Sequence, residues 1–585
     1  MSEIIIGIDL GTTNSEVAVV ENGQTTVIGD ESTKIVPSVV GIAEDGSVLV
    51  GEAARNQYAL YPERTIKSIK RRMGTDQSVE MAGKEYQPQE ISAIILKHLK
   101  TQAEQYLGQS VSKAVITVPA YFNDAQRQAT KEAGVIAGLE VMRIINEPTS
   151  AALSYDITHH QRQNVLVYDL GGGTFDVSAV KMEDDIVEVV ATHGNNQLGG
   201  DDFDQKIIDH IVYQFNTENS IDVTTSLKSM ARITRAAEQA KCLLSSQPYV
   251  TIAEEYLYEK DGQPIHLNLE LSRLDYENLI TDYVEETLES VHIALKDAGL
   301  TVSDIDQILL VGGSTRTPLV RERLEELFDK QPRGDINPDL CVAMGAAVQG
   351  AMIAGLDVSA ILVDVTPYTF GTSAAGMLDG IPTFDRYVPI IHKNSPIPLT
   401  KSEAFQTMHD SQESVEVRVF QGENPLASEN IEIGSFHVEG LSKVPAGNIV
   451  VLQFAMDLNG VLEVTAKEKK TGLEKSIAID NAISRFEGQQ MDEAKQRIGE
   501  MFDGITDIEQ KASAYNSESS QQHRVVQAKA LVEKAERIMD NASPEDKEDM
   551  VNMIESINDA IANNNTESLT ASMEELSDIM YYLES

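Results

Sequence analysis

One short motif occurs twice in the chain, and it restricts the possible folds more than any other feature does. Residues 169–176 read DLGGGTFD between two apolar runs, 165–168 and 177–180. This pattern predicts a strand, a tight glycine turn and a returning strand. Residues 8–17 repeat the layout, with aspartate, leucine, glycine and valine in the same register. Two copies of one strand–turn–strand unit predict two similar halves that face each other.

The repeated turn has the chemistry of a phosphate site. Three consecutive glycines allow the backbone to approach a ligand closely and direct several N–H groups at one point, and such a concavity binds anions. Asp169 and Asp176 would repel a bare phosphate, so a divalent cation is expected between them and the phosphate oxygens. A single turn of this kind would fit a plain hairpin equally well. Its repetition favours a nucleotide held between the two halves.

Composition restricts the class of protein and its partners. At 585 residues the chain is long enough for several domains, and its formal net charge of −45 argues against nucleic acid as a general partner. The two cysteines, Cys242 and Cys341, give no disulfide framework and indicate a reducing compartment. The first residues lack the features of a signal peptide, and no apolar run approaches the length of a membrane span. These features predict a cytoplasmic protein without a membrane partner.

Further candidate residues lie outside the two turns. Residues 67–72 contain four basic side chains, and one lysine could face phosphate, although the pattern does not choose which one and a charged surface helix fits as well. Glu147 follows the apolar run 141–145, at a strand end where α/β proteins place their chemistry. Gly199 and Gly200 precede a predicted helix whose N-terminus could face phosphate.

Five segments together resemble the DnaK-type heat-shock (70-kilodalton) chaperone family. They are IGIDLGTTNS, VYDLGGGTFD, LLVGGSTRTP, TVPAYFNDAQRQAT and IINEPTSAAL, and the likeness extends over nearly the whole chain. The resemblance implies an α/β actin-like ATPase domain with two similar lobes, followed by an antiparallel β-sandwich and an α-helical lid. The implied boundaries are 1–357 for the ATPase domain, 358–364 for an apolar linker, 365–483 for the peptide-binding sandwich and 484–585 for the lid.

The resemblance also implies roles for individual residues of the ATPase domain. Lys70 matches the lysine that positions the attacking water, Glu147 and Thr174 match residues beside the γ-phosphate, and Asp9, Asp169 and Asp176 would surround Mg²⁺ largely through water. The implied cofactors are ATP or ADP with Mg²⁺, and the family also admits K⁺. Residues matching the phosphate turns and the adenosine pocket are Gly11, Thr12, Thr13, Asn14, Gly171, Gly172, Gly173, Gly199, Gly200, Glu238, Lys241, Ser245, Gly312, Gly313, Ser314 and Arg316. Many members carry an arginine at the position of Cys242, which stacks on the adenine together with one at the position of Arg316.

The expected function is that of an ATP-dependent chaperone, active in protein folding and the stress response. ATP binding and hydrolysis would control the release and capture of short extended apolar segments. The implied partners are unfolded polypeptides, a nucleotide exchange factor, and a J-domain co-chaperone near Arg143 and Asp364. Ile361, Leu362 and Val363 are the apolar residues of the linker, which would dock on the ATPase domain when ATP is bound. The peptide site would contain Thr372, Ala374, Ala375, Phe405, Met408, Gln412, Val415 and Val417.

The chain also departs from the general pattern of the family. Thr372, Ala374 and Ala375 stand where larger apolar residues are usual, and Met408 replaces a small one. Together with the short connection from Met73 to Gly83, these departures resemble a compact bacterial variant, such as the HscC-like relatives. A small-molecule kinase or an actin-like assembly protein on the same ATPase fold is the alternative, but the linker, sandwich and lid argue against both.

Overall fold

The computed structural model describes residues 4–30, 33–155, 162–183, 186–333, 337–356, 361–478 and 490–502, together with residues 550, 553, 554 and 556. The chain divides into two compact units, 1–499 and 500–585, and the architecture below is that of the first unit. Within the described residues no helix combines the length and the apolar character needed to cross a membrane.

The first lobe is built on a six-stranded sheet. Its main path runs in the order β11 (Glu140–Asn146), β10 (Lys113–Val118), β1 (Ile5–Leu10), β2 (Asn14–Glu21) and β3 (Gln24–Val27), and β4 (Val36–Pro37) pairs with β2. Strands β1 and β2 form the first predicted hairpin, and β1 also pairs in parallel with β10. The helices α2 (Pro88–Leu107) and α3 (Asp124–Ile136) pack against this lobe. Because β1 and β10 are covered on both faces, they read as continuous apolar runs.

The second lobe repeats this plan. Its sheet has the order β17 (Gln307–Val311), β12 (Gln163–Leu170), β13 (Phe175–Glu183), β14 (Ile186–Asn195), β18 (Ile361–Val365) and β21 (Pro396–Ile397). Strands β12 and β13 form the second predicted hairpin, and β12 pairs in parallel with β17 as β1 does with β10. The prediction of two similar halves from the repeated motif is therefore confirmed.

Two helices rich in small residues, α4 (Glu147–Ser154) and α9 (Cys341–Ile353), pack closely against each other. A Cβ atom on Gly345 would lie 1.7 Å from the Ser150 carbonyl oxygen, and one on Gly7 would lie 2.0 Å from the Ala347 nitrogen. Glycine is therefore required where α9 crosses both α4 and β1.

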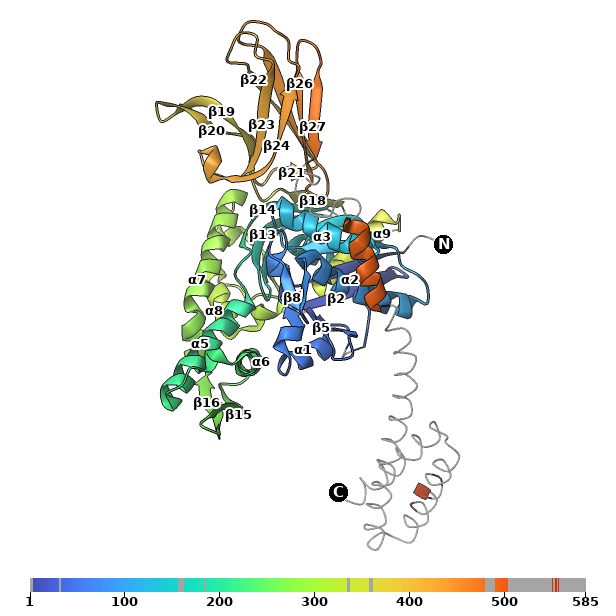
Figure 1. The fold of residues 1–585 in the computed structure, drawn as a ribbon, viewed down its shortest axis with the longest axis vertical. Helices are drawn as coiled ribbons and strands as arrows, with labels where there is room; N and C mark the ends of the chain where they lie inside the picture. Colours follow the sequence, from blue (N-terminus) through green and yellow to red (C-terminus); the bar gives the residue numbers. More distant parts are fainter. Residues whose placement is uncertain are drawn as a thin grey trace. The chain divides into compact units, whose positions relative to one another are not determined.

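Each lobe also has an outer part. In the second lobe α5 (Gly200–Asn219), α6 (Leu227–Leu244) and α7 (Arg273–Ala298) pack with the hairpin β15 (Tyr249–Lys260) and β16 (Gln263–Ser272) around an apolar core (Figure 1). In the first lobe the corresponding part is smaller. It contains β5 (Val39–Ile42), β6 (Val48–Val50), α1 (Glu52–Tyr58), β7 (Thr65–Lys67), the 3₁₀ helix η2 (Ile69–Arg72), β8 (Val79–Met81) and β9 (Lys84–Tyr86).

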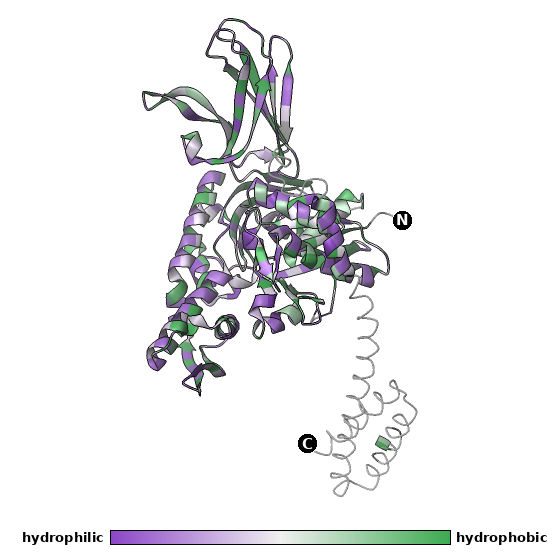
Figure 2. Ribbon diagram, in the orientation of Figure 1, coloured by the Kyte–Doolittle hydropathy of each residue, from purple (hydrophilic) through white to green (hydrophobic). Residues whose placement is uncertain are grey.

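A β-sandwich follows the ATPase-like part. One sheet has the order β20 (Ile381–Ile391), β19 (Phe370–Leu378), β23 (Ser414–Gln421) and β24 (Ile431–Glu439), and the other has β22 (Leu399–Gln406), β25 (Ile449–Met456), β26 (Leu462–Glu468) and β27 (Glu474–Ala478). Side chains alternate between core and solvent in the middle of β23, where Val417 and Val419 are buried while Glu416 is exposed. Figure 2 shows the resulting mixture of hydrophilic and hydrophobic residues along these strands.

Two predicted segments fall partly outside the described residues. Of the linker 358–364, residues 361–364 are described, and they form most of β18. Of the lid 484–585, residues 490–502 are described as helical. Within the first unit, Arg497 of this helix forms an ion pair with Glu90 of α2.

Candidate functional site

The two glycine turns meet at a cavity of about 310 Å³ between the lobes. This volume is at the lower end of the range for sites that bind cofactors and drug-sized ligands. The predicted residues that line the cavity are Asp9, Gly11, Thr12, Thr13, Asn14, Lys70, Glu147, Asp169, Gly171, Gly172, Thr174, Glu238, Lys241, Ser245, Gly312, Gly313, Ser314 and Arg316. Residues more than 300 positions apart in the sequence thus line one cavity.

The remaining predicted phosphate-turn residues lie behind this lining. The backbone N–H of Gly200 donates to the carbonyl of Gly171 over 2.9 Å, and that of Asp201 donates to Gly172 over 2.7 Å. A Cβ atom on Gly199 would lie 2.6 Å from the backbone of Gly172. The first N–H groups of α5 therefore hold the glycine turn, so these two donors are not free for an anion. Gly199 and Gly200 shape the cavity through the turn.

Lys70 is the only basic side chain of the predicted patch that reaches the cavity. It projects from η2, is 3% exposed, and forms an ion pair with the Glu147 carboxylate at the start of α4. Its ammonium also lies 5.7 Å from the centre of the Phe122 ring. A lysine buried this deeply is held in one position by its partners, and a fixed cation is what the stabilisation of phosphate charge requires.

Three aspartates surround this ion pair, of which Asp169 and Asp176 are buried and Asp9 is half-buried. Asp9 accepts a hydrogen bond from Thr117 Oγ1 over 2.8 Å, and Asp176 accepts from the backbone N–H of Tyr121 over 3.0 Å. Burial and then the Glu147 carboxylate raise the pKa of Asp9 to about 7 and that of Asp176 to about 7, and the same two causes raise the pKa of Asp169 well above its usual range. Negative charge is therefore crowded beyond what Lys70 alone can balance.

Hard oxygen donors with raised pKa values suit a hard divalent cation, which would favour their ionised forms. Among the described residues, no group of three or more histidine, cysteine, aspartate and glutamate side chains is placed to hold a metal directly. The carboxylate oxygens of Asp9, Asp169 and Asp176 are donors of the kind that a hard cation such as Mg²⁺ accepts.

The predicted adenosine side of the cavity contains its own ion pairs. Lys241 Nζ lies 2.8 Å from Asp204 Oδ2 and donates to the carbonyl of Gly200 over 3.0 Å. Burial disfavours the ammonium, but the Asp204 carboxylate outweighs burial and raises the pKa of Lys241. Arg316, another predicted adenosine residue, pairs with Asp339 over 2.5 Å. Charged groups on this side are thus fixed by protein partners.

Sequence reasoning missed two acidic residues of the cavity, Glu16 and Asp339. Glu16 is 2% exposed, and burial followed by the Asp9 carboxylate raises its pKa well above the usual range. The repeat contained the signal, since Glu16 occupies in the first copy the position that Asp176 occupies in the second. Asp339 had no such signal, because only the fold brings the start of α9 to Arg316.

The described part of the predicted linker, residues 361–364, lies against the second lobe. Strand β18 pairs in parallel with β14, and its registers place Leu362 opposite Val187 and Val363 opposite Glu188. Asp364 is 5% exposed and accepts hydrogen bonds from Asn146 Nδ2, over 3.0 and 2.9 Å, and from Thr149. The predicted partner-contact residue Asp364 thus has partners within the protein.

Arg143, the other residue matched to the J-domain contact, is half-buried and donates to Gln349 Oε1 over 2.9 Å. The pKa of its guanidinium is lowered by burial, against the opposing effect of Asp364. Arg143 and Asp364 therefore lie near each other, and both side chains have partners within the protein.

The residues predicted for the peptide site are only partly brought together. Thr372 and Val417 are buried within the sandwich, whereas Ala375 and Met408 are exposed. Gln412 accepts from the backbone N–H of Met408 over 3.0 Å and so orders the segment after β22. Ala374, Phe405 and Val415 are half-buried between these groups.

The hairpin formed by β19 and β20 extends beyond the sheet. Only residues 370–372 of β19 pair with β23, so among the described strands residues 373–378 pair with β20 alone. This leaves an open strand edge beside exposed apolar side chains. They are Met377 at 57%, Ile381 at 69% and Phe384 at 79% exposure.

Comparisons with known proteins agree on one family. A model described as "Hsp70 protein" matches residues 5–81 and 75–585. A protein named "Chaperone protein DnaK" from Thermotoga neapolitana is 45% identical over 572 residues, which cover 96% of this chain and 93% of that protein. The protein of the same name from Thermosipho africanus is 43% identical over 583 residues, which cover 98% and 95% respectively.

Proposed function

This chain belongs to the Hsp70 family and is an ATP-dependent chaperone and ATPase, and we propose that ATP in the cavity between its lobes controls peptide capture and release in its β-sandwich. The observation that carries the proposal is the Lys70–Glu147 pair, buried among three aspartates where the two glycine turns meet. A small-molecule kinase or an actin-like assembly protein is not favoured, because the family match includes the β-sandwich.

In the proposed mechanism the turns at 11–14 and 171–173 bind the phosphates. The second turn does so through the N–H groups of Gly172 and Gly173, because that of Gly171 donates to the Thr174 carbonyl over 3.0 Å. Asp9, Asp169 and Asp176 would hold Mg²⁺, largely through water, and the ion would neutralise phosphate charge when bound. Lys70 orients the attacking water, Glu147 fixes Lys70, and Thr174 lies beside the γ-phosphate. Glu238, Lys241, Ser245, Gly312, Gly313, Ser314 and Arg316 surround the adenosine. K⁺ stays a prediction.

The division of the chain supports coupling between the two activities. We assign residues 1–357 to the ATPase domain, 358–364 to the linker, 365–483 to the peptide-binding sandwich and 484–585 to a helical lid. The pairing of β18 with β14 supports a linker that docks on the ATPase domain. A J-domain co-chaperone near Arg143, a nucleotide exchange factor and a cytoplasmic location are part of the same proposal.

The first test is stimulation of ATP turnover by an unfolded, apolar polypeptide. We expect an increase of several-fold with peptide and none with sugars, because filling the sandwich would change the docking of the linker. If turnover responds to a small-molecule acceptor and not to peptide, the kinase alternative is supported and the proposal fails.

We further expect Phe384→Ser to weaken the apparent peptide affinity about tenfold while leaving basal ATP turnover unchanged. An open strand edge pairs with an extended chain, and a fully buried aromatic side chain contributes about 1.5–3 kcal/mol. Tyr213→Ser is the matched control, since Tyr213 is 67% exposed on α5. Equal peptide affinity for Phe384→Ser and wild type would remove the hairpin from the peptide site.

Another prediction concerns Cys242, which lines the cavity together with Glu238 and Ser245. Cys242→Arg should slow ADP release about fivefold, because a guanidinium stacked on an aromatic ring contributes about 1 kcal/mol. Stopped-flow release of a fluorescent nucleotide measures this rate, with Cys242→Ala as the control that adds no charge. Release that is unchanged or faster in Cys242→Arg would show that the adenine does not stack against this position.

A further inference from the structure

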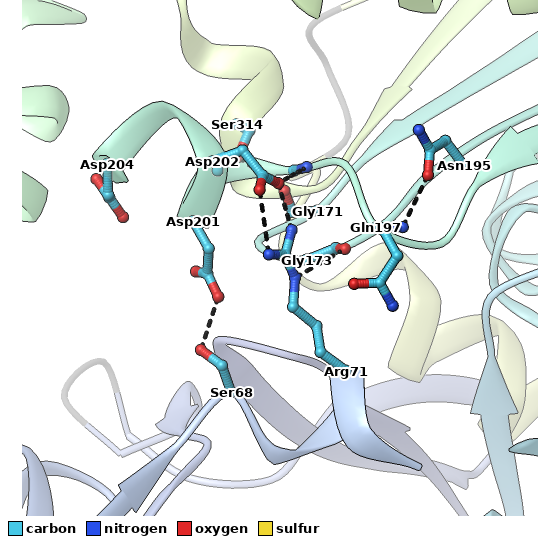
Figure 3. Close-up of polar contacts among 12 residues, drawn as sticks. Ser68, Arg71, Gly171, Gly173, Asn195, Gln197, Asp201, Asp202, Asp204 and Ser314 are labelled. Atoms are coloured by element: carbon cyan, nitrogen blue, oxygen red, sulfur yellow. Dashed lines mark hydrogen bonds and ion pairs between the residues drawn. The ribbon is translucent and has the colours of Figure 1, made fainter. Parts of the chain in front are cut away.

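Two side chains of the first lobe reach the second lobe beside the phosphate-binding turn (Figure 3). Arg71 of η2 donates from Nε to the carbonyl of Gly173 over 3.1 Å, and both its terminal nitrogens contact the Asp202 carboxylate, with Nη1 at 3.2 Å from Oδ1. One residue before η2, Ser68 Oγ donates to Asp201 Oδ2 over 2.7 Å. These contacts join the lobes.

Asp202 also anchors the helix that it belongs to. Its carboxylate accepts the backbone N–H of Gly199 over 2.8 Å, in the first turn of α5. The N–H groups of Gly200 and Asp201 hold the carbonyls of Gly171 and Gly172, as described above. Arg71 therefore contacts both the turn and the helix start that supports it, and one guanidinium fixes two phosphate-site elements of the second lobe.

The local backbone is adapted to these contacts. Ser68 has a positive φ of 53°, a conformation that residues other than glycine adopt rarely and that tertiary contacts must maintain. A Cβ atom on Gly173 would lie 2.8 Å from Arg71 Nε, so the approach of the arginine requires glycine there. The backbone at Ser68 in one lobe and the absence of a side chain at Gly173 in the other thus both permit the contacts between the lobes.

We propose that the Arg71–Asp202 pair is a latch between the lobes that sets the rate of nucleotide release. The inference rests on the proposed binding of nucleotide between the lobes, because a nucleotide held there leaves only when the lobes separate. Separation must break the bidentate pair and the bond from Arg71 to Gly173. Arg71 is a positioning residue, and it acts through the turn and α5.

The latch also links release to hydrolysis. Arg71 follows Lys70 directly in η2, so movement of η2 away from the second lobe moves the Lys70 ammonium as well. When the latch opens, the Lys70 ammonium, which is proposed to position the attacking water, moves away from the glycine turn. Hydrolysis therefore takes place only while the latch is closed and the nucleotide cannot leave.

Stopped-flow release of a fluorescent ADP analogue from the full-length protein tests the proposal. Arg71→Ala and Asp202→Asn should each speed release about fivefold, the effect expected of one charge-assisted, partly exposed pair. The double variant should release no faster than Arg71→Ala, because the two residues act as one contact. Arg72→Ala, which alters the exposed neighbour of Arg71, should leave release unchanged.

A second measurement separates the latch from a general loss of stability. Salt screens a partly exposed ion pair, so raising salt should speed release from wild type and Arg72→Ala but not from Asp202→Asn. Asp202→Asn keeps an oxygen that can accept the Gly199 N–H, so its thermal unfolding should stay close to wild type. Unchanged release in both single variants, or additive effects in the double variant, would overturn the latch. A wild-type protein that binds no nucleotide would instead overturn the proposed function.

Discussion

Lys70→Ala is expected to lower the rate of ATP hydrolysis at least ~100-fold, equivalent to about 2.7 kcal/mol of transition-state stabilisation, while ATP still binds. The proposed role of the ammonium is to position the attacking water, and its burial beside Glu147 fixes it for that role. The phosphate-binding turns do not depend on Lys70, since Gly171 and Gly172 are held by the first N–H groups of α5. Lys70→Ala should therefore retain ATP binding while it loses most of its hydrolysis rate.

Single-turnover hydrolysis and equilibrium nucleotide binding measure the two effects independently. Lys67→Ala is the matched control, because Lys67 is three residues away, exposed, and 5.4 Å from the centre of the Tyr58 ring. It should hydrolyse ATP at the wild-type rate. A near wild-type rate of single-turnover hydrolysis in Lys70→Ala would show that Lys70 does not take part in the mechanism. Loss of nucleotide binding would show instead that Lys70 contributes to binding and not to hydrolysis.

The second large effect is expected from Ile361, Leu362 and Val363 when all three are replaced by aspartate. Leu362 and Val363 are half-buried against the second lobe, and Leu362 packs on the core that contains Val187. Two carboxylates buried there, at about 2 kcal/mol each, would shift docking of the linker about 1,000-fold. ATP-driven release of peptide should be abolished while ATP binding is retained.

The structure sharpens this prediction, because the three side chains are not equivalent. Ile361 is 57% exposed, so Ile361→Asp alone should leave ATP-driven release close to wild type. Leu362→Asp should carry most of the loss. Release of a labelled peptide after rapid mixing with ATP distinguishes these variants. Fast release from the triple variant would show that β18 is not the coupling element.

Local sequence determined the two-lobe plan and most of the cavity. The glycine turns at 9–16 and 169–176 and the strands around them follow from apolar patterning and from close contacts that leave no room for a Cβ atom on Gly11 or Gly172. Because the motif is repeated, its glycines together with Asp169 and Asp176 could be predicted from the sequence to form one nucleotide site, although Glu16 of the first copy was missed. The family resemblance added Lys70 and the residues of the adenosine side, which periodicity alone would not have selected.

Tertiary structure decided which of these groups are free and which are held. Sequence spacing cannot show that Asp364 accepts hydrogen bonds from Asn146 and Thr149, because 215 or more residues separate each donor from it. Nor can it show that Arg71 crosses to Asp202, since an ion pair between lobes depends on how two separately folded units face each other. The peptide residues were the least predictable, because a strand residue near the hairpin is buried or exposed according to where the neighbouring strand ends. Thr372 pairs with β23 and is buried, while Ala375 lies beyond that strand and is exposed.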